Sequence, residues 1–282
     1  TDFFNTNKLL KTFKLNLKED DVQFFLDNLL KYRIIFDEFI LRIRQDENVV
    51  TNYFINHHQD YDDKNNLVQY QSMLLVSTTI NLWLSPLLIH LQSNHSNTSY
   101  SSLLIYLKNW DNERQKSFVN LDYGSIDRYW FWRLDYYLWE NKNEFFTEDE
   151  LEIAKKYIFK ANRSIEHISP QNLIDGDKRL FDVKYLDTFG NLTMISGGQN
   201  SSLKNEAFQI KKAHVKSFIE GSRSGTIESL KMLDIYKYEI WDELSLKEHY
   251  IKMLQILLNS FDDNQDIQLN LEELKNNLLS DV

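Results

Sequence analysis

The chain contains no cysteine and very little proline or glycine. Its 282 residues include two Pro and seven Gly. Without thiolates the protein can form no disulfide and hold no cysteine-bound zinc, so any metal ion must bind oxygen or nitrogen ligands. The shortage of turn-forming residues argues against a fold of many β-strands. We therefore expect a mainly α-helical protein, and the lack of cysteine is compatible with a reducing cytoplasm.

The sequence also lacks the features of a secreted or membrane protein. It begins at Thr1 without a basic stretch followed by an apolar run, so we expect no secretory signal and a cytoplasmic location. Residues 65–107 carry no Asp, Glu, Lys or Arg, but Asn81, Pro86 and His90 interrupt the apolar part. These residues favour buried core helices over a membrane span. The start at Thr1 is what we expect of a fragment of a longer protein.

Charge is distributed unevenly along the chain. The formal net charge is −10, yet residues 151–220 hold eleven Lys and Arg against eight Asp and Glu. An acidic protein is not expected to coat nucleic acid nonspecifically, because phosphate binding is driven mainly by Lys and Arg. One locally basic segment therefore lies within an acidic body.

Apolar residues recur at helical spacing through most of the chain. Asp20 and Asp21 are plausible N-terminal caps of a helix that continues to Leu41. Further helices are expected at 67–90, 100–120, 125–141, 228–241 and 246–258, and in the acidic tail. The aromatic residues between Tyr129 and Trp139 favour a buried helix over a surface for base stacking.

Residues 161–225 follow a different pattern, with six of the seven glycines and Pro170. A short strand is predicted at 165–168, stopped by Pro170, and a second at 191–195, opened by Gly190. A turn at Gly197 and Gly198 leads into a predicted helix at 200–216. The expected order is strand, loop, strand and helix.

Three blocks in this segment resemble the HNH, or ββα-metal, endonucleases. The resemblance is narrower to the HNH domain at the C-terminal end of GmrSD-like modification-dependent restriction enzymes. The blocks are Glu166-His167-Ile168-Ser169-Pro170-Gln171, Gly190-Asn191-Leu192-Thr193-Met194 and residues 200–208, the last followed by Lys211 or Lys212. Asn200 follows Asn191 by nine residues, which is the family spacing. The resemblance covers about residues 161–215 and implies a small ββα-metal finger inserted in a helical protein.

Two features of similar proteins are missing. Many HNH proteins brace the finger with zinc held by two Cys-x-x-Cys pairs, so here we expect no structural zinc. GmrSD-like proteins usually also carry an upstream ParB-like domain with an Asp-Gly-Gln-Gln-Arg motif, which does not occur in this sequence. The resemblance therefore implies a ParB-like domain of the parent protein as a partner.

Phosphodiester hydrolysis requires a base that deprotonates water and a cation that neutralises charge on the phosphate. A neutral imidazole suits the first task, and a hard divalent ion held by oxygen atoms and water suits the second. We assign His167 as the general base, and Glu166 and Asn200 as ligands of one Mg²⁺ or Mn²⁺ ion. Adjacent strand residues point to opposite faces, so Glu166 and His167 can share a site only where the strand ends or bends. Ser169 and Pro170 supply such an end.

The remaining polar residues of the blocks receive supporting roles. Asn191 is expected either to orient the His167 imidazole or to tie the two strands together. Lys204, Lys211 and Lys212 are expected to contact DNA phosphates. His214 is an alternative base or metal ligand, but it lies far along the predicted helix.

The leading prediction is a divalent-metal-dependent DNA endonuclease. By resemblance, it would act in bacterial defence against foreign DNA, including modified or phage DNA. We expect a helical domain at 1–160, the HNH core at 161–216 and a C-terminal helical region at 217–282. One alternative is a catalytically inactive HNH scaffold that binds DNA or docks a subunit. Another is a helical interaction protein, which would lack paired strands at 165–168 and 191–195.

Overall fold

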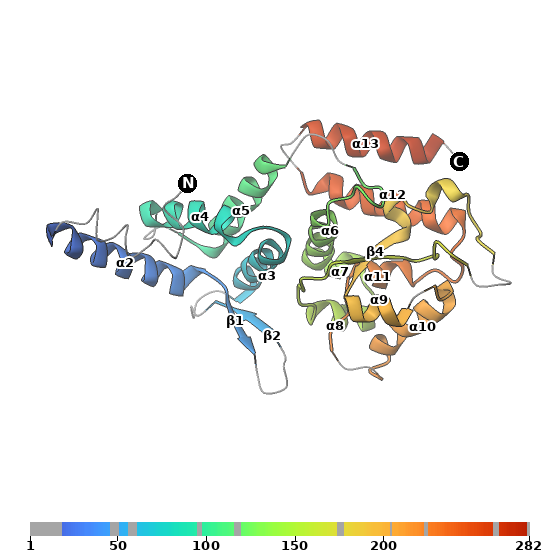
Figure 1. The fold of residues 1–282 in the computed structure, drawn as a ribbon, viewed down its shortest axis with the longest axis horizontal. Coiled ribbons are helices and arrows are strands. Elements are labelled where there is room, and N and C mark those ends of the chain that lie inside the picture. Colours follow the sequence, from blue (N-terminus) through green and yellow to red (C-terminus); the bar gives the residue numbers. More distant parts are fainter. Residues whose placement is uncertain are drawn as a thin grey trace.

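The computed structural model describes residues 19–45, 51–55, 61–94, 98–115, 120–173, 178–203, 205–222, 225–261 and 265–280. These residues form twelve α-helices and two small antiparallel two-stranded sheets (Figure 1). The predicted mainly α fold with a small inserted ββα-like element is confirmed. Within the described residues, no helix has the length and apolar character needed to cross a membrane. The three domain boundaries stay a prediction.

The N-terminal elements lie together on one side of the molecule (Figure 1). They are α2 (Glu19–Phe39), β1 (Arg42–Gln45), β2 (Thr51–Phe54), α3 (Tyr61–Ser77), α4 (Ile80–Asn94) and α5 (Tyr100–Arg114). The apolar region predicted as helical at 67–90 contains two helices, which separate at residues 78–79. The β1–β2 hairpin was not predicted, because residues 42–54 contain no glycine or proline to mark the ends of its strands.

The aromatic helix α6 (Tyr129–Glu140) lies at the centre of the fold, where it contacts α3 and α12. All its residues from Tyr129 to Trp139 are buried, which confirms the interpretation as core. Its Arg133 forms a fully buried ion pair with Asp111 of α5 at 3.0 Å. Because two charges are buried together, the pair fixes α5 against α6 and avoids an isolated charge in the core.

The C-terminal half contains α7 (Lys142–Phe145), α8 (Glu148–Lys155), α11 (Lys231–Ile235), α12 (Glu243–Asn259) and α13 (Gln265–Ser280). The helices predicted at 246–258 and in the acidic tail are present, with α13 along α12 (Figure 1). The prediction of a helix throughout 228–241 was wrong. Only five of these residues are helical. Asp135 of α6 accepts hydrogen bonds from the Ser229 hydroxyl and the Lys231 amide, and α11 begins at Lys231.

The inserted element consists of β3 (Ser164–His167), β4 (Leu192–Ile195), α9 (Gly197–Leu203) and α10 (Phe208–Ile219). Short 3₁₀ turns, η4 (Val183–Tyr185) and η5 (Phe189–Asn191), precede β4. The strands pair antiparallel, with Glu166 opposite Thr193. The single helix predicted at 200–216 is instead two helices, so α10 has an axis of its own. Gly190 allows η5 to approach α12, since a Cβ atom there would lie 2.8 Å from Cβ of Tyr250.

Candidate active site

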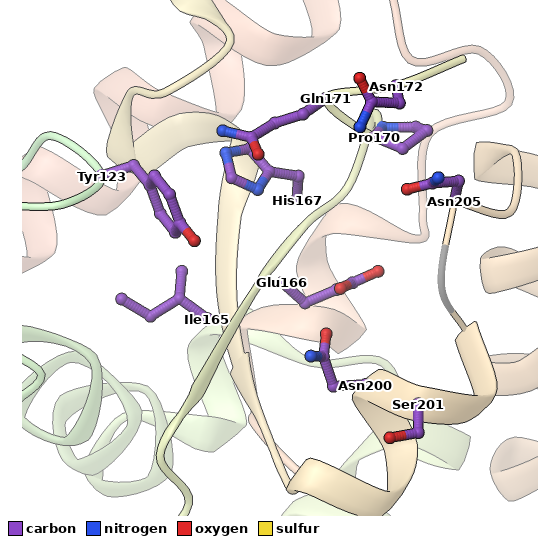
Figure 2. Close-up of a pocket in the computed structure, with 10 residues that line it drawn as sticks. All are labelled: Tyr123, Ile165, Glu166, His167, Pro170, Gln171, Asn172, Asn200, Ser201 and Asn205. Atoms are coloured by element: carbon purple, nitrogen blue, oxygen red, sulfur yellow. The ribbon is translucent and has the colours of Figure 1, made fainter.

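A pocket of about 470 Å³ lies beside the end of β3 (Figure 2). The lining residues belong to β3 and the loop that follows it, to α9 and the turn that follows it, and to the loop before α6. The lining residues are Tyr123, Ile165, Glu166, His167, Pro170, Gln171, Asn172, Asn200, Ser201 and Asn205. The fold therefore brings the three predicted residues with direct chemical roles, Glu166, His167 and Asn200, into one cavity.

The end of β3 lets two adjacent side chains serve the same pocket. The strand stops at His167, and the next amide, of Ile168, donates to the carbonyl of Asn191 at 2.8 Å. Figure 2 shows the His167 imidazole on the side of Tyr123 and the Glu166 carboxylate nearer Asn200. Both side chains are largely buried, and both line this cavity.

The imidazole of His167 is held by Asp187. Nε2 of His167 lies 2.8 Å from Oδ1 of Asp187, and the same carboxylate oxygen accepts a hydrogen bond of 3.0 Å from Gln171. Burial lowers the pKa of His167 below its ordinary value, and the Asp187 carboxylate opposes that shift. A carboxylate beside Nε2 favours a proton on Nε2, which leaves Nδ1 as the basic nitrogen.

Asp187 is a site residue that sequence reasoning missed. It stands three residues before Gly190 in the sequence, outside the three motif blocks, and twenty residues from His167. A carboxylate within reach of the base is chemically expected, because a base histidine needs its second nitrogen fixed. Of the nearby acidic residues, however, the sequence does not indicate which one folds back onto His167.

Glu166 forms a buried ion pair with Lys211 of α10. Oε1 of Glu166 lies 2.5 Å from Nζ of Lys211, which also donates to the carbonyl oxygen of His167 at 2.6 Å. Burial raises the pKa of Glu166, and the Lys211 ammonium group acts against that rise. Lys211 is completely buried, so the structure corrects the prediction that it contacts DNA. It instead joins α10 to the end of β3.

Lys212 is also directed into the protein. Its ammonium group donates to the carbonyl oxygen of Tyr238 at 2.7 Å and pairs with Glu239 at 2.9 Å. Only 3% of the residue is exposed, so the prediction of a phosphate contact is corrected here as well. The physical reason is the separate axis of α10, which packs this part of the helix against the protein. Lys204 lies outside the described residues.

Asn191 acts as a structural link between the segments on either side of the site. Its Oδ1 accepts hydrogen bonds from the amide of Ser169 and from Nε1 of Trp241, at 2.9 and 3.0 Å. Its Nδ2 donates to the carbonyl oxygens of Ser169 and Leu186. Of the two roles considered for Asn191, these contacts favour tying the chain at the strand ends over direct contact with the imidazole.

The pocket contains groups that could hold a hydrated magnesium ion. The side chain of Asn200, from α9, points toward the Glu166 carboxylate (Figure 2). Among the described residues, no three His, Asp or Glu side chains are grouped to hold a metal ion. Mg²⁺ commonly uses one or two carboxylates and keeps several waters, so one carboxylate, amide oxygens and an open pocket fit it. They do not fit the closed nitrogen and sulfur cage of a structural zinc site.

The structure does not bring His214 into this pocket. Its ring packs edge-on against Phe218 of the same helix, with the ring centroids 5.8 Å apart. It is also absent from the pocket lining. Of the two histidines considered as a base, His167 alone lines the pocket.

An imidazole fixed by one carboxylate and placed beside a second carboxylate has the groups that a hydrolase of phosphate esters requires. The family described as GmrSD restriction endonucleases, C-terminal domain, matches residues 106–256, and the chain belongs to it. This membership makes the protein a nuclease domain of the restriction-endonuclease class. The match extends well beyond the strands and helices of the pocket into α5, α6 and α12. No curated protein and no solved structure matches the chain.

Proposed function

We propose that this protein is an HNH endonuclease that hydrolyses phosphodiester bonds of DNA with a bound Mg²⁺ or Mn²⁺ ion. The observation that carries the proposal is the His167 imidazole, held by Asp187 at 2.8 Å in the same cavity as Glu166 and Asn200. Membership of a restriction-endonuclease family supports DNA as the substrate. The wider proposal is a cytoplasmic role in defence against foreign DNA, including modified or phage DNA, together with an upstream ParB-like domain.

In this mechanism Nδ1 of His167 takes a proton from a water molecule. The water oxygen forms a bond to phosphorus while the bond from phosphorus to the leaving sugar oxygen breaks. The negative charge of Asp187 stabilises the imidazolium that results. Glu166 and Asn200 would hold the metal ion, which supplies neutralisation of the charge on the phosphate and on the leaving oxygen. Asn191 and Lys211 keep the end of β3 in place through the contacts described above.

The metal requirement can be tested with Asn200→Ala in a plasmid-nicking assay. Wild-type cleavage should require Mg²⁺ or Mn²⁺ and stop when a chelator is added. Loss of one ligand should raise the half-maximal metal concentration about tenfold or more. The matched control is Asn259→Ala at the end of α12, where the side chain accepts a hydrogen bond from Gln255. An unchanged metal requirement in Asn200→Ala would show that Asn200 is not a metal ligand. Wild-type cleavage in excess chelator would show that the reaction needs no metal ion.

A second candidate function is an HNH scaffold without catalytic activity that binds DNA or docks a subunit. The Glu166–Lys211 ion pair favours it, because an ammonium group already neutralises the carboxylate proposed as a metal ligand. Binding of DNA by the full-length parent protein, without cleavage under any divalent metal, would support this alternative.

Two exposed arginines near the pocket are better placed than Lys211 and Lys212 to contact the DNA backbone. Arg163 directly precedes β3, and its carbonyl oxygen accepts a hydrogen bond of 2.9 Å from Nε of Arg128. Within the described part of the chain, neither guanidinium is paired with a carboxylate. Arg128 belongs to the same loop as Tyr123, which lines the pocket. Two exposed arginines in segments that also contribute to the pocket lining suit binding of DNA phosphates in an otherwise acidic protein.

The double variant Arg128→Gln/Arg163→Gln is therefore expected to lower the affinity for DNA. It should also make that affinity less dependent on salt concentration. Each lost phosphate contact should reduce the slope of log K against log salt concentration by about 0.9. The measurement is fluorescence anisotropy of a labelled duplex at several salt concentrations. The control Lys31→Gln/Arg44→Gln removes the same charge from α2 and β1. An equal change in both double variants would show that net charge, and not this pair, determines binding.

A further inference from the structure

Tyr123 lines the pocket although it comes from the loop before α6, outside the strand–strand–helix element. Its ring meets the His167 ring edge-on, with a centroid distance of 4.6 Å and an interplanar angle of 63°. The residue is 42% exposed, which is unusual for a large aromatic side chain in this protein. Figure 2 shows the ring beside the imidazole with its hydroxyl end directed toward the pocket.

The backbone of this loop is fixed to the segment that holds His167. The amide of Tyr123 donates to the carbonyl oxygen of Asp187 at 2.7 Å, and Asp122 forms a β-bridge with Thr188. Gly124 follows with φ of +89°, a left-handed conformation that glycine adopts without strain. Because Asp187 also binds His167 through its side chain, Tyr123 and His167 are positioned by the same residue.

The hydroxyl group of Tyr123 is available for a ligand. Among the described residues it has no hydrogen-bond partner. A phenol O–H is a good donor to an anionic oxygen, and hydrogen bonds of this type are roughly twice as strong as neutral ones. The other residues that line the pocket near His167 include amides, so a phosphate there would meet several neutral donors. The ring itself occupies one side of the imidazole and limits its rotation.

We propose that Tyr123 is a substrate-binding residue of the active site: its hydroxyl donates a hydrogen bond to a non-bridging oxygen of the scissile phosphate. Its ring at the same time keeps the His167 imidazole in its orientation. The inference rests on the proposed function, because it takes the phosphodiester of DNA as the ligand of the pocket. It also gives the loop before α6 a direct part in catalysis.

Tyr123→Phe tests the hydroxyl while it keeps the ring. The single-turnover rate of cleavage at saturating DNA is expected to fall about tenfold to hundredfold, as for loss of one donor to a reacting phosphate. A second readout uses phosphorothioate substrates with sulfur at either non-bridging position of the cleaved phosphate. Sulfur accepts hydrogen bonds poorly, so the wild type should cleave one phosphorothioate diastereomer more slowly than the ordinary phosphate. The ratio of these two cleavage rates should approach one in Tyr123→Phe. A purely structural tyrosine would not change this phosphorothioate ratio.

The control is Tyr106→Phe in α5, whose hydroxyl donates to the carbonyl oxygen of Pro86 away from the pocket. A wild-type rate and an unchanged phosphorothioate ratio in Tyr123→Phe would overturn the proposal while the nuclease function stands. If the wild type cleaves no DNA, the proposed function fails. Tyr123 is then tested separately by comparing the affinities for two duplexes, one with an ordinary phosphate and one with a methylphosphonate at the same position. Preference for the phosphate that persists in Tyr123→Phe would then overturn the proposal.

Discussion

Replacement of His167 by alanine is expected to lower the single-turnover rate of DNA cleavage by about two to four orders of magnitude. This is the usual contribution of a positioned general base. The imidazole is largely buried, is fixed through Nε2 by Asp187, and belongs to a residue that lines the pocket. The measurement is quenched-flow cleavage of a labelled duplex at saturating protein with Mg²⁺ or Mn²⁺.

The matched control for this prediction is His214→Ala. His214 lies on α10 outside the pocket, so its replacement should leave the cleavage rate within about twofold of the wild type. Thermal unfolding of both variants would establish that a lost rate does not reflect a lost fold. Cleavage that is retained in His167→Ala but lost in His214→Ala would reverse the assignment of the base.

Replacement of Lys211 by methionine is expected to lower the free energy of unfolding by about 3 to 5 kcal/mol. That is the usual cost when one partner of a buried ion pair is removed and the other remains charged. Lys211 is fully buried, and Glu166 would keep its carboxylate in the interior without the ammonium group that now lies 2.5 Å away. The hydrogen bond to the His167 carbonyl oxygen would be lost as well. Urea unfolding followed by circular dichroism measures the difference.

Two further variants separate the ion pair from other effects of Lys211. Lys216→Met changes an exposed lysine of the same helix and should leave stability nearly unchanged. The double variant Glu166→Gln/Lys211→Met should be more stable than Lys211→Met alone, because no unpaired charge remains buried. If Lys211→Met is as stable as the wild type but binds DNA poorly, the original prediction of a phosphate contact is right.

The local chemistry of the chain was sufficient to predict the strands of the site and their order. A short run with Ile165 and Ile168 ends at Pro170, and Gly190 opens the second strand, so each boundary depends on residues adjacent in sequence. The resemblance of the three blocks to HNH endonucleases then implied that Glu166, His167 and Asn200 meet at one site. The buried aromatic helix α6 followed in the same way from its composition.

Contacts between distant segments decided the rest of the site. Asp187 reaches His167 across twenty residues, and Tyr123 approaches it from a loop that the sequence places in another region. Lysines are usually exposed, so Lys211 and Lys212 were expected at the surface. The break between α9 and α10 gives the second helix its own axis, and that change buries both side chains against acidic and carbonyl groups.

The sequence by itself therefore determined the helical class of the protein and the two short strands. Both depend on backbone preferences, which act over a few neighbouring positions. The residues proposed for catalysis followed from the resemblance of the three blocks to HNH endonucleases. Only the tertiary structure decided which carboxylate holds the base, which lysine neutralises Glu166 and which tyrosine lines the pocket. Those choices depend on how separate helices pack and on which charged groups must find partners once packing removes them from water.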